Sequence, residues 1–292
     1  TEHMKKNYWL NDLPGRIAKV VQAVIVAGLS CILFGFSGFR AGGTAEVLLA
    51  DNGQAIHSIV VGSGASERTR EAAGDLAEYL GRVVGGEFEV KTGDGATGIA
   101  VGSYKDFPVL ELQDLFDSDN ISRRDEFLLR THDEGVYLVG ATDLAAQHAV
   151  WDFLYRIGYR QFFPTDTWEY VPQEPDLKIM LNDFEQPDFY NRNGPRAAAW
   201  GDSELWSRWH DRNRITSSFI LNTGHSYNGI INRNKQAFNE HPEYLSLVGG
   251  VRGGGQGDKF CISNENLRHL VVEDARNQIK ANPDINSISM DP

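Results

Sequence analysis

Three short apolar runs in the C-terminal half of the sequence are each followed directly by polar side chains. The runs cover residues 219–221, 259–262 and 285–290. The polar residues that follow them are Asn222, His225, Asn264 and Asp291. A parallel α/β barrel carries its site in the loops after its strands, so side chains in these places converge on one face. An aspartate there can act as an acid or base, and histidine can hydrogen-bond a hydroxyl group. The pattern therefore indicates chemistry on a hydroxylated substrate.

Asp291 is the candidate catalytic residue. Glycoside hydrolysis uses two carboxylates, one on each side of the scissile bond. Asp291 follows the last apolar run, in the position that one of these two carboxylates would take. The sequence identifies no partner for it, so both an acid/base role and a substrate-orienting role stay open.

Tryptophans are concentrated just upstream of these runs, since three of the six fall between residues 200 and 209. Indole rings offer a large apolar face with a polar edge, which suits the apolar C–H face of a sugar ring. Trp200 ends a predicted strand at residues 196–200 and is the better candidate for sugar contact. Trp206 and Trp209 are three residues apart on a predicted helix and fit either packing against a barrel or contact with sugar.

The other candidates for substrate contact each have a plainer alternative. Asn222 and His225 follow the second predicted strand, where the histidine fits either a sugar contact or an ordinary loop position. Asn264 fits either a sugar contact or the N-cap of a helix that runs to about residue 281. We therefore predict Asp291 as catalytic, and four residues as substrate contacts: Trp200, Asn222, His225 and Asn264.

The apolar runs and the segments between them predict the first half of a (β/α)8 barrel over residues 183–292. The predicted strands are 196–200, 219–221, 259–262 and 285–290. A complete barrel takes about 250 residues. We therefore expect the chain to be truncated within the barrel, and we expect the second catalytic carboxylate in the missing part.

Residues 46–182 predict a separate small α+β domain with a mixed sheet and two helices, so that the chain as a whole is of the α/β class. Ser66 can cap the first helix, and an apolar face recurs at helical spacing until Gly85 stops it. The second helix begins near Thr142. The predicted strands are 56–61, 87–91, 98–102, 126–130, 135–139, 159–163 and 168–171. A proline-punctuated stretch at residues 173–195 predicts a linker to the barrel.

Residues 1–45 have the pattern of a secretory signal peptide. A basic region precedes an uncharged apolar run at residues 20–36, and small residues follow at 41–45. The run is about as long as the shortest membrane-spanning helices, so an uncleaved membrane anchor is the alternative. We expect an exported protein, periplasmic, extracellular or at the cell surface, that touches a membrane only through this segment if it stays uncleaved.

The composition excludes several partners. A net charge of -12 and a pI of about 5.1 disfavour nucleic acid and anionic membrane surfaces as partners of the folded part. The two cysteines give no zinc pattern. The glycine-rich segment at residues 62–66 lacks the third glycine of a dinucleotide fingerprint and the lysine-serine pair of a phosphate loop. We therefore expect no cofactor and no metal.

Two resemblances extend this interpretation. The N-terminal domain resembles that of bacterial α-glucuronidases and β-hexosaminidase-like enzymes through Ala72-Ala73-x-x-Leu76-x-x-Tyr79-Leu80, Ile99-Ala100-Val101-Gly102, Glu126-x-x-Leu129-Arg130, Gly140-Ala141-Thr142 and Gly158-Tyr159-Arg160-x-Phe162-Phe163-Pro164. The C-terminal part resembles an uncharacterised family of exported bacterial barrel domains through Asn222-x-x-His225, His241-Pro242-Glu243-Tyr244, Cys261-x-Ser263-Asn264 and Ser289-Met290-Asp291-Pro292. The first resemblance implies a non-catalytic domain beside a catalytic barrel. The second implies a glycoside hydrolase of unspecified substrate.

The sequence thus predicts an exported glycoside hydrolase, or its N-terminal portion, that acts on a polysaccharide or oligosaccharide containing uronic acids or amino sugars. We expect this chain alone to be inactive, so its status as an enzyme stays open. One alternative is a non-catalytic carbohydrate-binding or cell-surface protein with an incomplete barrel. The other is a purely structural surface protein.

Overall fold

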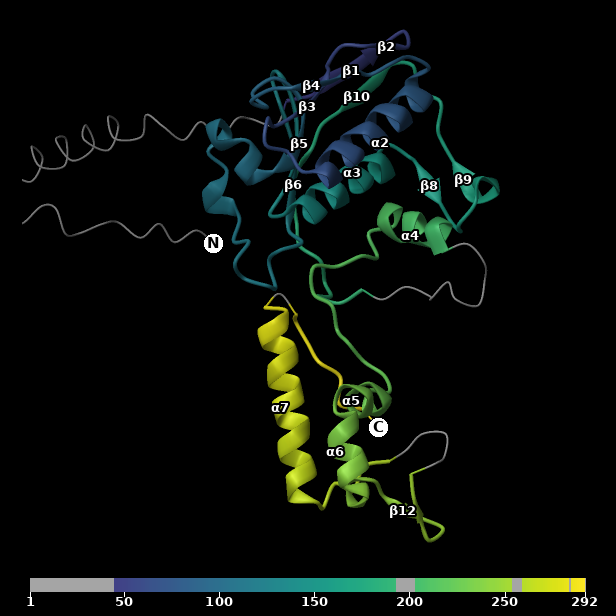
Figure 1. Cartoon of the computed structure of the whole chain (residues 1–292). Coiled ribbons are helices and arrows are strands. Elements are labelled where there is room, and N and C mark those ends of the chain that lie inside the picture. The colour runs from purple at the N-terminus through teal and green to yellow at the C-terminus, as the bar shows by residue number, and fades with distance from the viewer. Residues whose placement is uncertain (1–44, 193–202, 254–258, 284, 292) are drawn as a thin grey trace, which may run out of the picture. The chain divides into compact units, whose positions relative to one another are not determined.

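The computed structural model describes residues 45–192, 203–253, 259–283 and 285–291 (Figure 1). The chain divides into two compact units, Thr1–Gly43 and Thr44–Pro292, and all the described residues belong to the second. Most of the predicted signal or anchor segment, the predicted strand at 196–200 and Trp200 lie outside the described residues. None of the helices in the described ranges is long and apolar enough to cross a membrane.

A six-stranded mixed sheet is the centre of the N-terminal part, and its strand order is β11-β6-β7-β5-β3-β4. Its strands are β3 (Ile59–Val61), β4 (Val90–Thr92), β5 (Gly98–Ser103), β6 (Phe127–His132), β7 (Gly135–Gly140) and β11 (Asn182–Glu185). Strands β4, β3, β5 and β7 pair in parallel, whereas β6 runs antiparallel to both β7 and β11. The predicted mixed sheet is therefore confirmed, and the strands predicted at 126–130 and 135–139 form an antiparallel hairpin.

Two long helices, α2 (Glu67–Val84) and α3 (Asp143–Arg156), pack on one face of this sheet and against each other (Figure 1). Local signals set the ends of α2. The Ser66 side chain accepts the backbone N–H of Thr69 at 3.2 Å, as an N-cap does. Gly85 ends the helix with a left-handed φ of 82°, which glycine adopts without steric cost. The predicted caps and the two predicted helices are confirmed.

The opposite face of the sheet is covered by three short 3-10 helices, η1 (Tyr104–Asp106), η2 (Pro108–Leu110) and η3 (Gln113–Leu115). Successive strand residues point to opposite faces, so Ile59 joins the core under α2 while Val60 joins this second core. Phe107 and Leu128 are fully buried in the second core. Both faces are therefore apolar, and the sheet lies between one core under α2 and α3 and a second core under the 3-10 helices.

Two smaller β-structures complete the N-terminal part. Strands β1 (Val47–Asp51), β2 (Gln54–Ala55) and β10 (Leu177–Ile179) form a three-stranded antiparallel sheet. Strands β8 (Arg160–Gln161) and β9 (Glu169–Tyr170) form a hairpin that contains the 3-10 turn η4 (Asp166–Trp168). The interpretation of residues 173–195 as a linker is wrong, because β10 and β11 lie within this range and pair with β1 and β6.

The C-terminal part is mainly helical in the described residues. Its elements are α4 (Ser203–Arg212), α5 (Tyr227–Arg233), α6 (Lys235–Glu240), η6 (Pro242–Tyr244), β12 (Leu247–Val248), β13 (Val251–Arg252) and α7 (Glu265–Ala281). Ile230, Phe238 and Leu267 form a small core between α5, α6 and α7. The mixed α/β class is confirmed, while the half-barrel stays a prediction.

The predicted barrel strand at residues 259–262 is wrong. Phe260 makes an isolated antiparallel bridge with Leu245, whereas barrel strands run parallel to their neighbours. The Phe260 ring stacks on Tyr227 with their centroids 3.7 Å apart. Phe260 therefore fills the small helical core, while Ile262 is 71% exposed, and the run does not extend a sheet.

One buried carboxylate connects the N-terminal part to the segment that carries α4. Asp125 is 7% exposed and accepts the Arg192 guanidinium at 2.8 Å. It also accepts the backbone N–H of Ser218 at 3.1 Å. The same arginine donates to the carbonyl oxygens of Arg214 at 3.0 Å and Thr216 at 2.6 Å. Asp125 thus binds the chain on both sides of α4.

Candidate functional site

The two extended segments at residues 220–226 and 286–291 lie side by side, in parallel. His225 and Asp291 form a parallel bridge. The backbone N–H of Ser226 donates to the Asp291 carbonyl at 2.9 Å, and that of Gly224 donates to the Asp291 carboxylate at 3.1 Å. The sequence predicts residues 219–221 and 285–290 as the second and fourth strands of a barrel, with residues 259–262 between them. The parallel direction of the observed pairing agrees with this prediction, but the direct contact between the two segments does not.

Side chains make many of the contacts between these segments. Asn222 donates its backbone N–H to the Ser287 hydroxyl at 2.6 Å and its side-chain amide to the Ser287 carbonyl at 2.8 Å. The Ser289 hydroxyl donates to the Gly224 carbonyl at 2.6 Å. Serine and asparagine groups thus take the place of backbone groups in the ladder. This explains why the two segments are extended and paired without forming regular strands.

The structure brings together three of the five predicted site residues: Asn222, His225 and Asp291. The fourth, Asn264, is the N-cap of α7, and its side-chain oxygen accepts the Leu267 N–H at 3.1 Å. This geometry supports the capping alternative for Asn264, and none of the contacts described for it joins it to the other three. The fifth, Trp200, lies outside the described residues.

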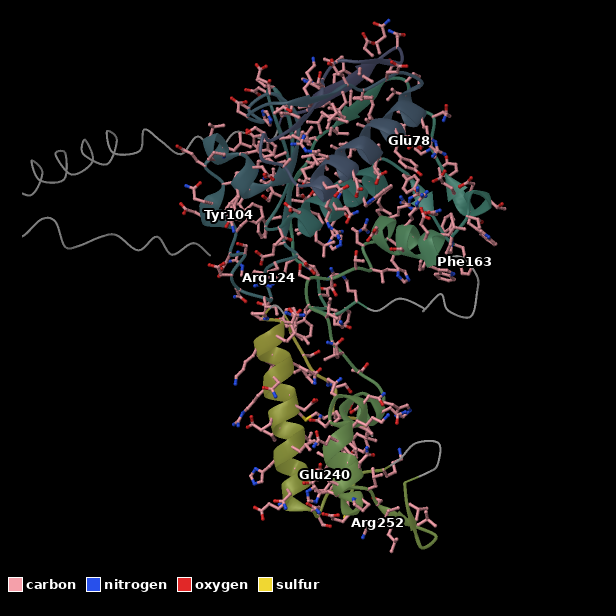
Figure 2. The ribbon with its side chains drawn as sticks, in the orientation of Figure 1. Glu78, Tyr104, Arg124, Phe163, Glu240 and Arg252 are labelled. Atoms are coloured by element: carbon pink, nitrogen blue, oxygen red, sulfur yellow. The ribbon has the colours of Figure 1, made fainter. Side chains whose placement is uncertain are left out.

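Trp206 and Trp209 pack inside the structure. Trp206 is 6% exposed, and its ring meets that of Phe163 with centroids 5.3 Å apart. Figure 2 labels Phe163 on the N-terminal part. The indole N–H of Trp209 donates to the Gln161 carbonyl at 3.1 Å. Of the two interpretations of this tryptophan pair, packing is the one that these contacts favour. The pair fixes α4 against the β8–β9 hairpin.

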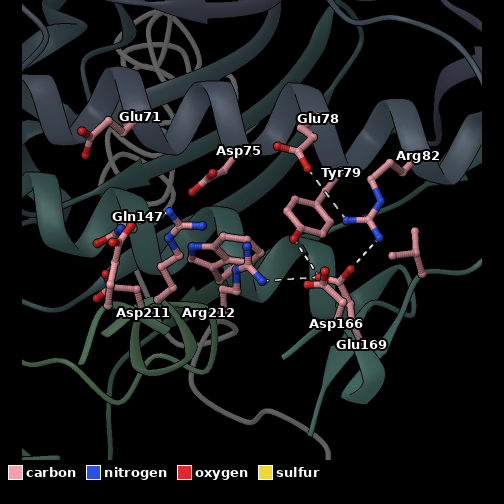
Figure 3. Close-up of a pocket in the computed structure, with 14 residues that line it drawn as sticks. Glu71, Asp75, Glu78, Tyr79, Arg82, Gln147, Asp166, Glu169, Asp211 and Arg212 are labelled. Atoms are coloured by element: carbon pink, nitrogen blue, oxygen red, sulfur yellow. Dashed lines mark hydrogen bonds and ion pairs between the residues drawn. The ribbon is translucent and has the colours of Figure 1, made fainter. Parts of the chain in front are cut away.

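A second polar site, which the sequence analysis missed, lies under α2 (Figure 3). It is a cavity of about 900 Å³ between α2, α3, η4, β9 and α4. Its walls are lined by Glu71, Asp75, Glu78, Tyr79, Arg82, Gln147, Trp151, Asp166, Glu169, Val171, Glu204, Arg208, Asp211 and Arg212. Seven of these side chains are acidic and three are arginines, so the cavity carries an excess of negative charge.

One wall of the cavity is a hydrogen-bonded group centred on Glu169. Its carboxylate accepts Arg82 at 2.5 Å, the Tyr79 hydroxyl at 2.7 Å and the Tyr159 hydroxyl at 3.1 Å, and Arg212 lies 3.4 Å away. Burial raises the pKa of Glu169, but hydrogen bonds from Arg82 and Tyr79 outweigh it and hold the pKa below its ordinary value. Burial and the bond to Glu169 raise the pKa of Tyr79 to about 12. This wall is therefore a fixed ion-pair network.

Asp75 also lines the cavity, and its pKa is shifted in the opposite direction to that of Glu169. Among the described residues it forms no ion pair. Burial raises its pKa from 3.8 to about 6, and the nearby Arg212 only partly opposes this. Neighbouring Glu78 and Glu71 raise the pKa further. At neutral pH the carboxylate is thus charged in surroundings that disfavour its charge.

The sequence alone does not indicate this cavity, for a physical reason. Glu71, Asp75 and Glu78 are spaced four and three residues apart on α2, which is also the spacing of an ordinary solvated helix face. Only α4 and β9, from distant parts of the sequence, turn this face into a cavity wall. Within the described ranges, no group of three or more His, Cys, Asp or Glu side chains could hold a metal ion.

Comparison with known proteins gives two findings. A family described as a domain of unknown function (DUF4838) matches residues 163–292. This is in line with the predicted resemblance of the C-terminal part to an uncharacterised family. A solved structure of a family GH115 4-O-methyl-α-glucuronidase, with specificity for decorated arabinogalactans, is similar with a TM-score of 0.46 and 13% identity. The match covers 77% of this chain and 40% of that enzyme, so the chain spans less than half of the enzyme. No curated protein matches.

Proposed function

We propose that this protein is an exported glycoside hydrolase, or part of one, that acts on polysaccharide containing uronic acids or amino sugars. One observation carries the proposal: the parallel pairing of residues 220–226 with 286–291. It places Asp291 beside Asn222 and His225 at the ends of two neighbouring extended segments. In a parallel barrel the strand ends are where the chemistry of the fold takes place. The resemblance of the N-terminal domain to that of α-glucuronidases gives the proposal its substrate class.

In this proposal Asp291 is an acid/base or substrate-orienting carboxylate. Hydrolysis of a glycosidic bond needs a second carboxylate across that bond. Asn222 and His225 would orient sugar hydroxyls, because amide and imidazole groups both donate and accept hydrogen bonds. Asn264 is left out of the proposed site, since its side chain caps α7.

The test is the turnover of aryl glucuronides and aryl N-acetylglucosaminides by the natural protein that contains this chain, with and without Asp291→Asn. Loss of a general acid or base lowers the rate roughly a hundredfold to ten-thousandfold. Asparagine keeps an oxygen that can accept the Gly224 N–H, so folding should be retained. Asp114→Asn, in η3, is the matched control and should leave turnover unchanged. Equal turnover by the Asp291→Asn protein would remove Asp291 from the mechanism.

A non-catalytic carbohydrate-binding protein is the second candidate. It is favoured by the structural use of the same side chains, because the Asn222 amide and the Asp291 carboxylate hold two backbone segments together. Oligosaccharide binding measured by calorimetry, with no hydrolysis of any linkage, would establish this second function and refute the first.

Export is part of the proposal and has its own test. N-terminal sequencing of the protein recovered outside the cytoplasm should give a chain that begins near residue 46 if the segment is a cleaved signal peptide. A membrane-bound protein that keeps residues 1–45 would indicate an anchor. Recovery of the protein in the cytoplasm alone would refute export.

A further inference from the structure

A smaller hollow lies beside β8, between the end of α3 and the end of α4, and is called the β8 hollow below (Figure 1). Its volume is about 260 Å³, slightly below the roughly 300 to 1,000 Å³ of sites for drug-sized ligands, and it suits a single sugar ring. Three aromatic rings, two side-chain amides and two guanidinium groups line it. No carboxylate is present among the described residues of this lining, which distinguishes the β8 hollow from the acidic cavity under α2.

One of the two guanidinium groups, that of Arg160, is held in a fixed position. It lies over the Tyr155 ring, 3.5 Å from the ring centroid. Its Nη1 donates to the carbonyl oxygens of Tyr155 at 2.5 Å and of Tyr159 at 2.6 Å. Stacking and two hydrogen bonds together set the plane and the direction of the guanidinium. Arg160 is therefore oriented before any ligand arrives.

The opposite edge of the same guanidinium is open. In the part of the chain that the structure describes, Nε and Nη2 of Arg160 have no hydrogen-bond partner, and Arg160 forms no ion pair. The enclosed side-chain nitrogens that lack a partner belong to His132, Trp151 and His210, so both Arg160 nitrogens keep contact with solvent. Nε and Nη2 form the fork of an arginine that binds a carboxylate through two parallel hydrogen bonds. The open edge of Arg160 is thus ready to bind a carboxylate.

The charges around the β8 hollow also favour an anion. The second arginine of the lining, Arg212, is paired with Glu169 at 3.4 Å and adds little net charge. The charge of Arg160 is not balanced in this way by any of the described residues. A ligand ammonium group would be repelled here, whereas a carboxylate would be attracted.

Two further groups in the lining suit a sugar. Phe162 is 66% exposed, and its apolar ring face can pack against the C–H groups of a sugar ring. Asn213 donates its side-chain N–H groups to the carbonyl oxygens of Gln161 at 3.2 Å and Trp209 at 2.9 Å. These bonds fix the amide, and its Oδ1 accepts no hydrogen bond from the described residues. The Asn213 oxygen can therefore accept a hydroxyl group of the ligand.

These features together narrow the ligand class. Acetate supplies the carboxylate for Arg160 but no ring for Phe162. A neutral sugar supplies the ring and the hydroxyl groups but no charge. An amino sugar brings the wrong charge. A sugar ring that carries a carboxylate supplies every partner that the lining requires.

We propose that the β8 hollow binds a uronic acid residue, as a ligand site separate from Asp291. The carboxylate of the uronic acid accepts hydrogen bonds from Nε and Nη2 of Arg160, its ring packs on Phe162, and one of its hydroxyl groups donates to Asn213. The inference rests on the proposed function for the presence of polysaccharide, and it selects uronic acids over amino sugars for this site. The site would hold an acidic sugar of the chain while chemistry takes place elsewhere.

Calorimetric titration of the full chain near neutral pH and at low salt tests the proposal. The ligands are methyl glucuronide, methyl glucoside, acetate and glucosamine. Methyl glucuronide should bind, and each of the other three should bind at least about tenfold more weakly, because each lacks the carboxylate or the ring. Equal affinity for all four ligands, or a dissociation constant for methyl glucuronide above about 10 mM, would overturn the proposal.

Three variants connect the binding to the β8 hollow. Arg160→Gln should weaken methyl glucuronide binding about tenfold or more, since it removes a charged donor. Arg160→Lys keeps the charge and a donor for the two carbonyl oxygens, which favours folding, but it lacks the planar fork and should still lose about threefold to tenfold. Phe162→Ala should weaken binding about twofold to tenfold, and the exposure of Phe162 makes loss of folding unexpected. Circular dichroism checks the folding of all three.

Arg70→Gln is the matched control. Arg70 is an exposed arginine on α2 that donates to the Ser63 carbonyl and does not line the β8 hollow. This variant should bind methyl glucuronide as the unmodified chain does. A folded Arg160→Gln protein with unchanged affinity would place the ligand elsewhere and overturn the proposal.

Asp291→Asn separates this site from the proposed hydrolase site. It should leave the binding of methyl glucuronide intact even if it abolishes turnover of glycosides. Binding that is lost in Asp291→Asn but retained in Arg160→Gln would place the uronic acid at Asp291 and refute a separate site. The failure of the β8 hollow as a site can thus be distinguished from the failure of the proposed function.

Discussion

Replacing Asp75 by asparagine should stabilise the folded protein at neutral pH. Asp75 is mostly buried, and its pKa rises from 3.8 to about 6 on folding. One pKa unit corresponds to 1.36 kcal/mol, so the buried charge costs at most about 3 kcal/mol. Asp75 keeps some contact with solvent, which screens its charge, and we therefore expect a gain of about 1 to 2 kcal/mol. Asparagine has nearly the same shape and no charge, so it removes this cost.

The sign of the pH dependence follows from the raised pKa. Between 3.8 and about 6 the folded state holds the Asp75 proton more tightly than the unfolded state does. The stability of the unmodified protein therefore falls as pH rises through this window. The cost is fully present above the window and absent below it. The stabilising effect of Asp75→Asn should accordingly be greatest above pH 6 and should fade toward pH 4.

Urea unfolding of both proteins across this pH range is the assay. The difference between their free energies of unfolding isolates Asp75, because groups common to both proteins cancel. Glu67→Gln is the control and should change stability by less than about 0.5 kcal/mol at any pH. If Asp75→Asn were destabilising at neutral pH, or if its effect were independent of pH, the account of a charge buried at a cost would be refuted.

Three further outcomes follow from contacts in the structure. Arg192→Met should lower the free energy of unfolding by about 3 kcal/mol or more, because it leaves the buried Asp125 carboxylate without its cation; urea unfolding with unchanged stability would contradict this. Asn264→Ala should cost about 1 kcal/mol while Asn264→Ser costs little, and equal losses measured in the same way would show that no cap is present. The pKa of Glu169 is lowered on folding from 4.5, so its stabilisation is present above pH 4.5 and is lost as pH falls through the folded value. Glu169→Gln should thus lower the free energy of unfolding at neutral pH, and the stability of this variant should fall less steeply as the pH is lowered. If thermal unfolding of the variant and of the unmodified protein showed the same dependence on acid pH, this would argue against the network.

The parts of the fold that local signals determine could be predicted from the sequence. Ser66 and Gly85 mark the ends of α2 because capping and left-handed backbone depend on only a few neighbouring residues. The hairpin of β6 and β7 was predictable for the same reason, since a tight turn separates two apolar runs. These predictions needed no knowledge of distant segments.

The linker interpretation of residues 173–195 failed because strand pairing is not local. The strand β10 has three residues and β11 has four, so neither shows a clear alternation. Their partners are β1 and β6, which lie far away in the sequence. The prolines of this stretch flank the two strands and do not interrupt them.

The candidate site could be predicted in part. The apolar runs before Asn222 and Asp291 correctly indicated two parallel extended segments. Their direct pairing was not predicted, because the run at residues 259–262 was expected to lie between them. An apolar run does not reveal the direction of its partner, however, and the run at residues 259–262 pairs antiparallel at Phe260. The cavity under α2 could not be predicted, because its second wall comes from α4 and β9 and only the tertiary structure brings those elements to Asp75.

The double attachment at Asp125 has a consequence for how this fold can vary. A single carboxylate accepts Arg192 and the Ser218 backbone, so the polypeptide between them begins and returns at nearly the same point. Lengthening a loop whose ends are already joined is inexpensive, since each doubling adds only about 0.6 kcal/mol of closure entropy. The stretch between Arg192 and Ser218 could therefore be lengthened at a small cost in closure entropy, while the register of the residues that follow is preserved. Asp125 thus fixes where this stretch leaves and rejoins the N-terminal part, whatever the length of the chain between.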